Sequence, residues 1–157
     1  MAVLAADSTI ALMGGGVKIV GPANGADIFY SGAILWGLAA GYVSCAPSAG
    51  DRPLGICTKR QTTLAQGDFV EYVVGGTYLW VTLATLTAAD IGDNLVFDSS
   101  VAVSDNPADA LTSGDVTAAV NDVFLGRIVG FDAAGKGIVC LDGMGLIMNT
   151  AGAVAYV

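Results

Sequence analysis

The sequence predicts an all-β fold: a small β-barrel or barrel-like sandwich of short antiparallel strands and hairpins, with at most one or two short helical turns. No window shows sustained helical periodicity, whereas short apolar and β-branched segments recur between clusters of Gly, Asp, Asn and Ser. Of the 14 acidic residues only Glu71 is a glutamate, and aspartate favours turns where glutamate favours helix interiors. The chain is 54% hydrophobic and has 22 glycines, a composition that fits strands joined by tight turns.

The beginning of the chain differs in character from the rest. A chain of 157 residues is long enough to form one domain without a metal or disulfides. We expect an extended N-terminal arm over residues 1–20 and a single β-barrel-like domain over residues 21–157. The three glycines at 14–16 would form the hinge of the arm, and an ordinary first strand is the alternative for this segment. Its large apolar residues stand among small ones: Val3, Leu4, Ile10, Leu12 and Met13.

The clearest hairpin signal is a pair of apolar runs, residues 69–74 and 77–83, separated by Gly75-Gly76. A two-residue Gly-Gly loop suits a type I′ turn, which needs positive φ at both positions. Pairing outward from Val74 and Thr77 puts one set of side chains on a core face. The opposite face carries Glu71 among large apolar residues, so we expect a barrel neighbour or another subunit to half-cover it. Its candidate subunit-interface residues are Phe69, Val73, Tyr78 and Trp80.

Two further segments have local signals. Thr87 is an expected N-cap of a single helical turn that ends at Gly92 in the left-handed region. The section at about 98–122 is rich in Ser, Asp, Asn, Pro and Gly, which favours an acidic surface excursion. Calcium loops place oxygen ligands at every second residue, and the aspartates of this section do not have that spacing, so we expect no metal there.

Residues 130–137, GFDAAGKG, match most of a phosphate-binding loop. That motif requires a Ser or Thr after the lysine and a helix that begins there. Gly137 stands in the hydroxyl position, and the run from Ile138 to Leu141 is typical of a strand. The sequence therefore predicts a hairpin loop between two strands and not a nucleotide site.

Groups that commonly carry catalysis or bind metals are scarce. The chain has no histidine, the commonest general base and metal ligand. Cys45, Cys57 and Cys140 have no metal-binding spacing, which favours buried free thiols. The net charge of −8 disfavours direct nucleic-acid binding, and the charge-free stretch at 28–50 is too interrupted for a membrane span. We expect a protein that is not an enzyme and has no cofactor and no metal.

The order of motifs resembles a family of small bacteriophage virion proteins, the capsid decoration or cement proteins, over roughly residues 27 to 142. The matching motifs are GAILWG at 32–37, RPLGIC at 52–57, QGDFVEY at 66–72, ADIGDNLVFD at 89–98, LGRIVG at 125–130 and IVCL at 138–141. The best match is the Gly-Asp-x-aliphatic-aromatic-Asp strand, at 92–98.

The resemblance implies a β-barrel-like structural protein, made in the host cytoplasm, that binds the outside of an icosahedral capsid. It would stabilise the capsid by bridging subunits of the major capsid protein, as a homo-oligomer for which we favour a trimer over a dimer. Family members contact the capsid through an N-terminal arm, which assigns that contact here to Val3, Leu4, Ile10, Leu12 and Met13. The alternative is a head-fibre or tail-associated adhesive module that binds a receptor. A hydrolase or nucleotide enzyme is a further rival, which binding of ATP at Lys136 would support.

Overall fold

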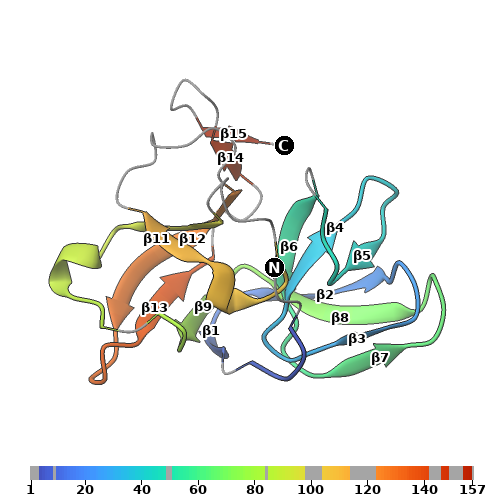
Figure 1. The fold of residues 1–157 in the computed structure, drawn as a ribbon, viewed down its shortest axis with the longest axis horizontal. Helices are drawn as coiled ribbons and strands as arrows, with labels where there is room; N and C mark the ends of the chain where they lie inside the picture. The colour runs from blue at the N-terminus through green and yellow to red at the C-terminus, as the bar shows by residue number, and fades with distance from the viewer. Residues whose placement is uncertain are drawn as a thin grey trace.

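The computed structural model describes residues 4–8, 10–48, 51–83, 85–97, 104–113, 123–141, 146–148 and 154–156, the last two ranges and Ser113 by backbone alone. Antiparallel strands make up about half of the described chain, and its helical structure is confined to two 3₁₀ turns, Ala88–Asp90 and Pro107–Asp109. The all-β prediction is confirmed. The strands form two main sheets, which lie side by side in Figure 1.

The large sheet contains eight strands. Its order is β1 (Ala11–Gly14), β9 (Thr77–Trp80), β13 (Gly137–Cys140), β12 (Val123–Phe131), β10 (Asn94–Phe97) and β11 (Leu111–Ser113), with β14 (Leu146–Met148) and β15 (Val154–Tyr156) attached through β12. The β12–β13 hairpin has the predicted loop at 132–136, since Phe131 pairs with Gly137. The predicted turn after Thr87 is also present: Thr87 and Asp90 form a capping box, and Gly92 has a φ of 98°.

The second sheet, called the curled sheet below, has five strands. Its order is β2 (Val17–Pro22), β8 (Phe69–Val74), β6 (Arg52–Ile56), β4 (Ile34–Gly37) and β5 (Val43–Ser44), and a separate pair, β3 (Asp27–Phe29) and β7 (Gln61–Thr63), lies beside it. The sheet bends until its two ends meet, where Ala23 and Val43 form a single parallel bridge. It approaches a barrel without closing, so the barrel-like sandwich is the form compatible with the described strands.

Two hydrophobic clusters hold these layers together. The larger cluster lies between the sheets: Ile34, Trp36, Ile56 and Val73 come from the curled sheet, and most of its other members come from the large sheet. The smaller cluster, which includes Phe29, Leu35, Val70 and Tyr72, joins the curled sheet to β3. Trp36 contacts Phe97 across the main core, with ring centroids 5.6 Å apart.

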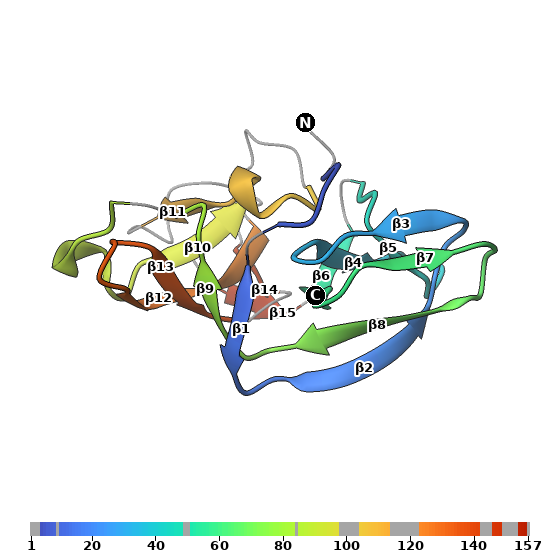
Figure 2. The same ribbon diagram turned by 90° about the horizontal axis from the view of Figure 1, so that it is seen from below.

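The hairpin expected over residues 69–83 is not formed. Gly75 and Gly76 have the predicted positive φ values of 70° and 93°, but β8 and β9 belong to different sheets and do not pair. Instead β8 pairs with β2 and β9 pairs with β1. Gly15 and Gly16, also at positive φ, lie beside this corner, because a Cβ on Gly15 would be 3.5 Å from the Cα of Gly76. Two bent chains thus run side by side from one sheet into the other, as Figure 2 shows.

The segment expected to be an arm is mostly part of the sheets. β1 and β2 together cover residues 11–14 and 17–22 and pair with β9 and β8 over most of their length. Residues before them also contact the rest of the chain: Ser8 N donates to Ser31 O (2.7 Å), and Leu4 N donates to Asp105 Oδ1 (3.0 Å). The alternative of an ordinary first strand is therefore the correct one from residue 11 onward, and the domain includes this segment.

The expected surface excursion at 98–122 is contradicted in part of its described segment, residues 104–113. Ala108, Leu111 and Thr112 are exposed, as a surface segment would be, but other residues are not. Ser104 and Asp105 are buried, with 1% and 2% of their surface exposed. Two tryptophans from different sheets donate to this segment: Trp36 Nε1 to Ser104 O (2.9 Å) and Trp80 Nε1 to Pro107 O (3.1 Å). The main chain of 104–107 therefore satisfies both indoles, and a polar composition here reflects hydrogen bonding inside the fold and not solvation.

Candidate functional site

The most unusual surface of the described chain is an exposed run of apolar side chains on three adjacent strands, β1, β2 and β8. All residues from 11 to 20 are exposed. Seven large apolar side chains on these strands are each 38–75% exposed, and we call them the apolar edge: Leu12, Met13, Val17, Ile19, Val20, Phe69 and Val74. Single exposed apolar residues are common on proteins, but this many on neighbouring segments is typical of an interaction surface.

The position of this surface adds a second property. β1 is the end strand of the large sheet and β2 is the end strand of the curled sheet. Among the described residues, no strand pairs with the outer side of either one, apart from the single bridge at Ala23, so their N–H and C=O groups face outward. Natural proteins normally protect such an edge with charges, prolines or a covering element. Here only Lys18 and Pro22 serve that purpose.

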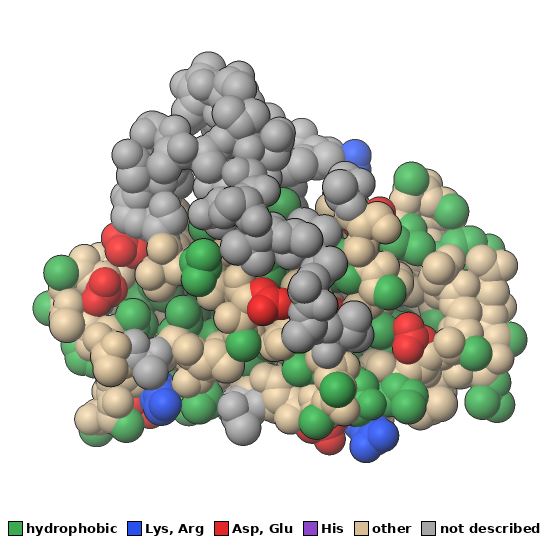
Figure 3. Space-filling view, viewed as in Figure 1, with side chains coloured by type: hydrophobic (Ala, Val, Ile, Leu, Met, Phe, Trp, Pro, Cys, Tyr) green, Lys and Arg blue, Asp and Glu red, His purple; other side chains and the backbone are tan. Residues whose placement is uncertain are grey.

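A small charged group borders the apolar edge. Glu71 Oε1 lies 3.3 Å from Lys59 Nζ and 3.6 Å from Lys18 Nζ, and the two lysines lower the pKa of this carboxylate. The Gln61 side chain holds the neighbouring strand in place, because it donates to Glu71 O (2.7 Å) and accepts from Glu71 N (2.8 Å) as a strand backbone would. On the face of the molecule seen in Figure 3, acidic and basic side chains are scattered and form no patch of one sign.

The structure separates the predicted site residues into two groups. Of the four interface candidates, Phe69 is 75% exposed, whereas Val73, Tyr78 and Trp80 are buried in the chain's own core. These three side chains are therefore not available to a partner, which corrects the prediction. The reason is the absent hairpin. Because β8 and β9 belong to different sheets, the side expected to face a partner instead faces the core between the two sheets.

The arm candidates divide in a similar way. Leu12 and Met13 are exposed and belong to the apolar edge. Leu4 and Ile10 are half-buried and pack against the smaller and the larger cluster respectively. Val3 lies outside the described residues. Sequence reasoning missed Val17, Ile19, Val20 and Val74, although the run from Val17 to Val20 has the β-branched composition of a strand.

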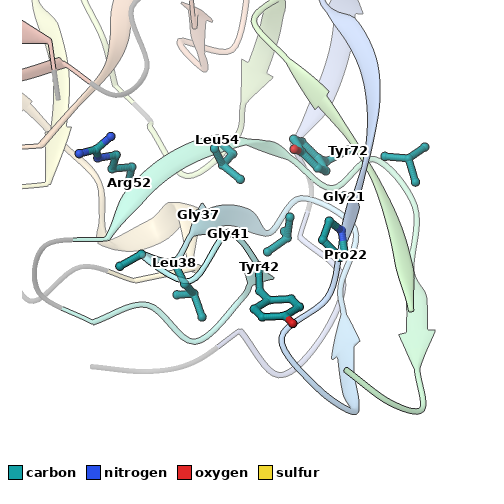
Figure 4. A pocket seen from close by; sticks show the side chains of 12 residues that line it. Gly21, Pro22, Gly37, Leu38, Gly41, Tyr42, Arg52, Leu54 and Tyr72 are labelled. Atoms are coloured by element: carbon teal, nitrogen blue, oxygen red, sulfur yellow. The ribbon is translucent and has the colours of Figure 1, made fainter. Parts of the chain in front are cut away.

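The second candidate site is an open groove of about 650 Å³ on the curled sheet. Figure 4 shows Tyr72 and Leu54 on one wall, Tyr42 and Leu38 on the opposite wall and Arg52 at one end. The remaining lining residues are Val20, Gly21, Pro22, Gly37, Ala39, Gly41 and Val43. The groove therefore lies between the two ends of the curled sheet, β2 and the β4–β5 turn, and Arg52 is its only charged lining residue.

The buried titratable groups are poorly suited to catalysis. Burial, together with the Asp27 carboxylate that accepts from its Sγ at 3.1 Å, raises the pKa of Cys45. Burial also raises the pKa of Cys57. Both thiols are thereby kept protonated, and the third cysteine, Cys140, is also free. Among the residues that the structure describes, no group of three Cys, Asp or Glu side chains could hold a metal ion.

The loop that resembles a phosphate site is occupied by its own hydrogen bonds. Asp132 Oδ1 accepts from Ala134 N and Lys136 N, both at 2.9 Å, and Gly135 N donates to Asp132 O. The next element is the strand β13 and not a helix. The loop therefore offers few free N–H groups to a phosphate, and the hairpin interpretation is confirmed.

Comparisons with known proteins assign no family to the chain. No family model, no curated protein and no solved structure matches the chain. Within the described part of the chain, no helix is both long enough and apolar enough to cross a membrane.

Proposed function

We propose that the protein is a structural virion protein that binds the outside of a phage capsid and stabilises it by bridging subunits of the major capsid protein. The observation that carries this proposal is the apolar edge. Its exposed side chains and outward-facing backbone groups form a surface for docking on another protein, and docking requires no catalytic centre.

The composition of the surface supports this role. A standard interface takes about 800 Å² from each partner and has an apolar centre with a polar rim. The apolar edge supplies such a centre, and Lys18, Lys59 and Glu71 supply part of the rim. Repetition of one modest contact over a capsid lattice gives a large collective stabilisation. The net charge of −8 suits an outer position, where the protein need not approach packaged DNA.

Self-association is part of the proposal. The open sides of β1 and β2 are on the same bent edge, so neighbouring copies and capsid subunits can share it. We favour a trimer over a dimer, because a trimer fits the local threefold positions of an icosahedral lattice. Sedimentation velocity on the purified chain measures this number directly.

The decisive experiment measures copy number and its dependence on the apolar edge. Purified capsids from the source of this sequence are analysed by electron microscopy and quantitative mass spectrometry, and high, lattice-matched occupancy is the expected result. Capsids stripped of the protein are then incubated with the wild type, with the double variant Val17→Asp, Val20→Asp and with Ile91→Asp as a matched control. Ile91 is 50% exposed and lies on the loop before β10.

The double variant is expected to lose at least tenfold in binding, while the control binds as the wild type does. Equal binding of all three proteins would show that the apolar edge does not face the capsid. A few copies at a single vertex would favour the head-fibre or tail-associated adhesive module instead.

A further inference from the structure

We infer that the groove on the curled sheet binds an extended, mostly apolar peptide segment of a partner protein, with one carboxylate of that segment paired to Arg52. This peptide site shares Val20 and the outer side of β2 with the apolar edge, but the inference does not depend on the capsid role. The inference is based on the shape of the groove, on the open edge of β2 and on the isolated charge at one end.

The walls of the groove fit apolar side chains. Tyr72 is buried with its ring toward the groove, and burial raises the pKa of its hydroxyl. Leu54 is half-buried beside it, and Leu38 and Tyr42 on the β4–β5 turn face them. Ligand sites commonly combine such an apolar lining with a small number of polar groups, in volumes of about 300–1,000 Å³.

Glycines let the walls of the groove pack closely against their neighbours. A Cβ on Gly21 would lie 2.6 Å from Val43 Cγ2, so glycine is what lets β2 approach β5 at this end. A Cβ on Gly37 would lie 3.2 Å from Leu54 Cδ2, so no side chain can stand there without moving Leu54. The space beside each of these glycines is therefore filled by the protein's own side chains, which fixes how closely the walls of the groove approach each other.

The topology of the curled sheet favours an extended ligand. In an antiparallel sheet of five strands the first and last strands point the same way, and here they meet only through the parallel bridge between Ala23 and Val43. One additional strand between them would run antiparallel to both. The outer edge of β2 at Val20 and Gly21 lines the groove and pairs with no described strand, which offers a peptide main-chain hydrogen bonds by strand addition.

Charge determines which peptide fits. Arg52 is exposed at the end of the groove, and no described carboxylate lies within salt-bridge distance of it. Its neighbour Asp51 accepts a hydrogen bond from Ser48 N (2.7 Å) instead. In a chain of net charge −8, a guanidinium with no ionic partner among the described residues, in a groove whose other lining residues are uncharged, is suited to a carboxylate, which it can bind through two parallel hydrogen bonds.

The test selects octapeptides from a random display library on the full chain and on three variants. Arg52→Gln removes the charge, and Ala39→Trp adds a large side chain at an exposed position that lines the groove. Arg60→Gln is the matched control, because Arg60 is an exposed arginine that lies over the Tyr30 ring, outside the groove. Unfolding curves first verify that all variants fold as the wild type does.

We expect enriched peptides in which apolar residues accompany an Asp or Glu. Their affinity, measured by fluorescence anisotropy, should fall about tenfold on Arg52→Gln and on replacement of the peptide's Asp by Asn, and more on Ala39→Trp. The Arg60→Gln variant should stay within twofold of the wild type. Absence of enrichment would overturn the inference, as would peptides that lack a carboxylate or that bind Ala39→Trp equally well. Binding of dodecanoate that depends on Arg52, without peptide binding, would assign the groove to small amphiphiles and also overturn it.

Discussion

Two neighbouring chain segments with similar composition have opposite environments. Residues 69–80 and residues 11–22 run side by side, each bends at a Gly-Gly corner, and each is rich in valine and other large apolar residues. The first segment buries Val70, Tyr72, Val73, Tyr78 and Trp80, whereas the second exposes all residues from 11 to 20. Apolar composition therefore predicts a strand but not its place in the sheet. An end strand that keeps this composition needs a partner to cover it.

The largest expected effect comes from a substitution in the buried segment, residues 69–80. Trp80→Ala removes a fully buried side chain and leaves Pro107 O without its indole donor, so we expect a loss of about 3–5 kcal/mol in the free energy of unfolding. Val20→Ala on the exposed segment should change it by less than about 0.5 kcal/mol. Urea unfolding followed by circular dichroism measures both values. Similar losses in the two variants would mean that the exposed segment contributes to the core.

The second prediction compares the stability cost of a side chain at the two glycine corners, one in each segment. Gly16 and Gly75 both have positive φ, 76° and 70°, but a Cβ on Gly16 would lie 2.5 Å from Val73 Cγ1. A Cβ on Gly75 would have only Leu141 O nearby, at 3.9 Å. Gly75→Ala should thus lose about 1–2 kcal/mol from the left-handed backbone alone, and Gly16→Ala about 2–4 kcal/mol because it also disturbs Val73. The same denaturation measurement tests the order, and a larger loss for Gly75→Ala would refute it.

How much of this architecture could be predicted depends on the range of the interactions. The β12–β13 hairpin and the Thr87 cap follow from neighbouring residues, and both were predicted correctly. The Gly75-Gly76 corner was not, because positive φ at both residues fits a hairpin turn and a corner equally well. Pairing of β8 with β2 and of β9 with β1, which joins residues 47 to 68 positions apart in sequence, decides between them. No local pattern contains that information.

The same limit applies to the two surfaces proposed for binding. Leu12, Met13 and Phe69 were recognised as contact candidates from their composition, but Val17 and Val20 could be assigned only after β2 was placed at the sheet end. The groove results from the curl of a whole sheet, and its residues come from distant segments. The polar composition around Ser104 and Asp105 predicts exposure, but these residues are buried because two distant indoles donate to the backbone of their segment.

The third prediction concerns the anchor of the segment before β1. Burial raises the pKa of Asp105 to about 6, although Leu4 N donates to its Oδ1, and the nearby Asp27 and Asp109 raise it further. Since the ordinary value is 3.8, the folded state holds this proton more tightly than the unfolded state does. The contribution of Asp105 to stability is therefore complete below pH 4 and is lost as the pH rises to about 6.

The difference between the wild type and Asp105→Asn isolates this contribution. We expect the wild type to lose on the order of 2 kcal/mol relative to the variant between about pH 4 and pH 6.5, because the amide keeps an acceptor for Leu4 N and does not titrate. Denaturation at several pH values measures the difference. A flat difference across this range would show that the pKa of Asp105 is not raised.

The smallest expected change in stability comes from a substitution in the exposed segment, residues 11–22. Val20→Thr keeps the β-branched shape that suits a strand but replaces an apolar methyl with a hydroxyl at a position 57% exposed. The unfolding free energy should shift by less than about 0.5 kcal/mol, since no core contact is lost. If copies associate through β2, self-association must nevertheless weaken, because the hydroxyl has to be dehydrated at the contact. Sedimentation velocity at increasing concentrations separates the two quantities. Unchanged association would move the contact between copies away from Val20.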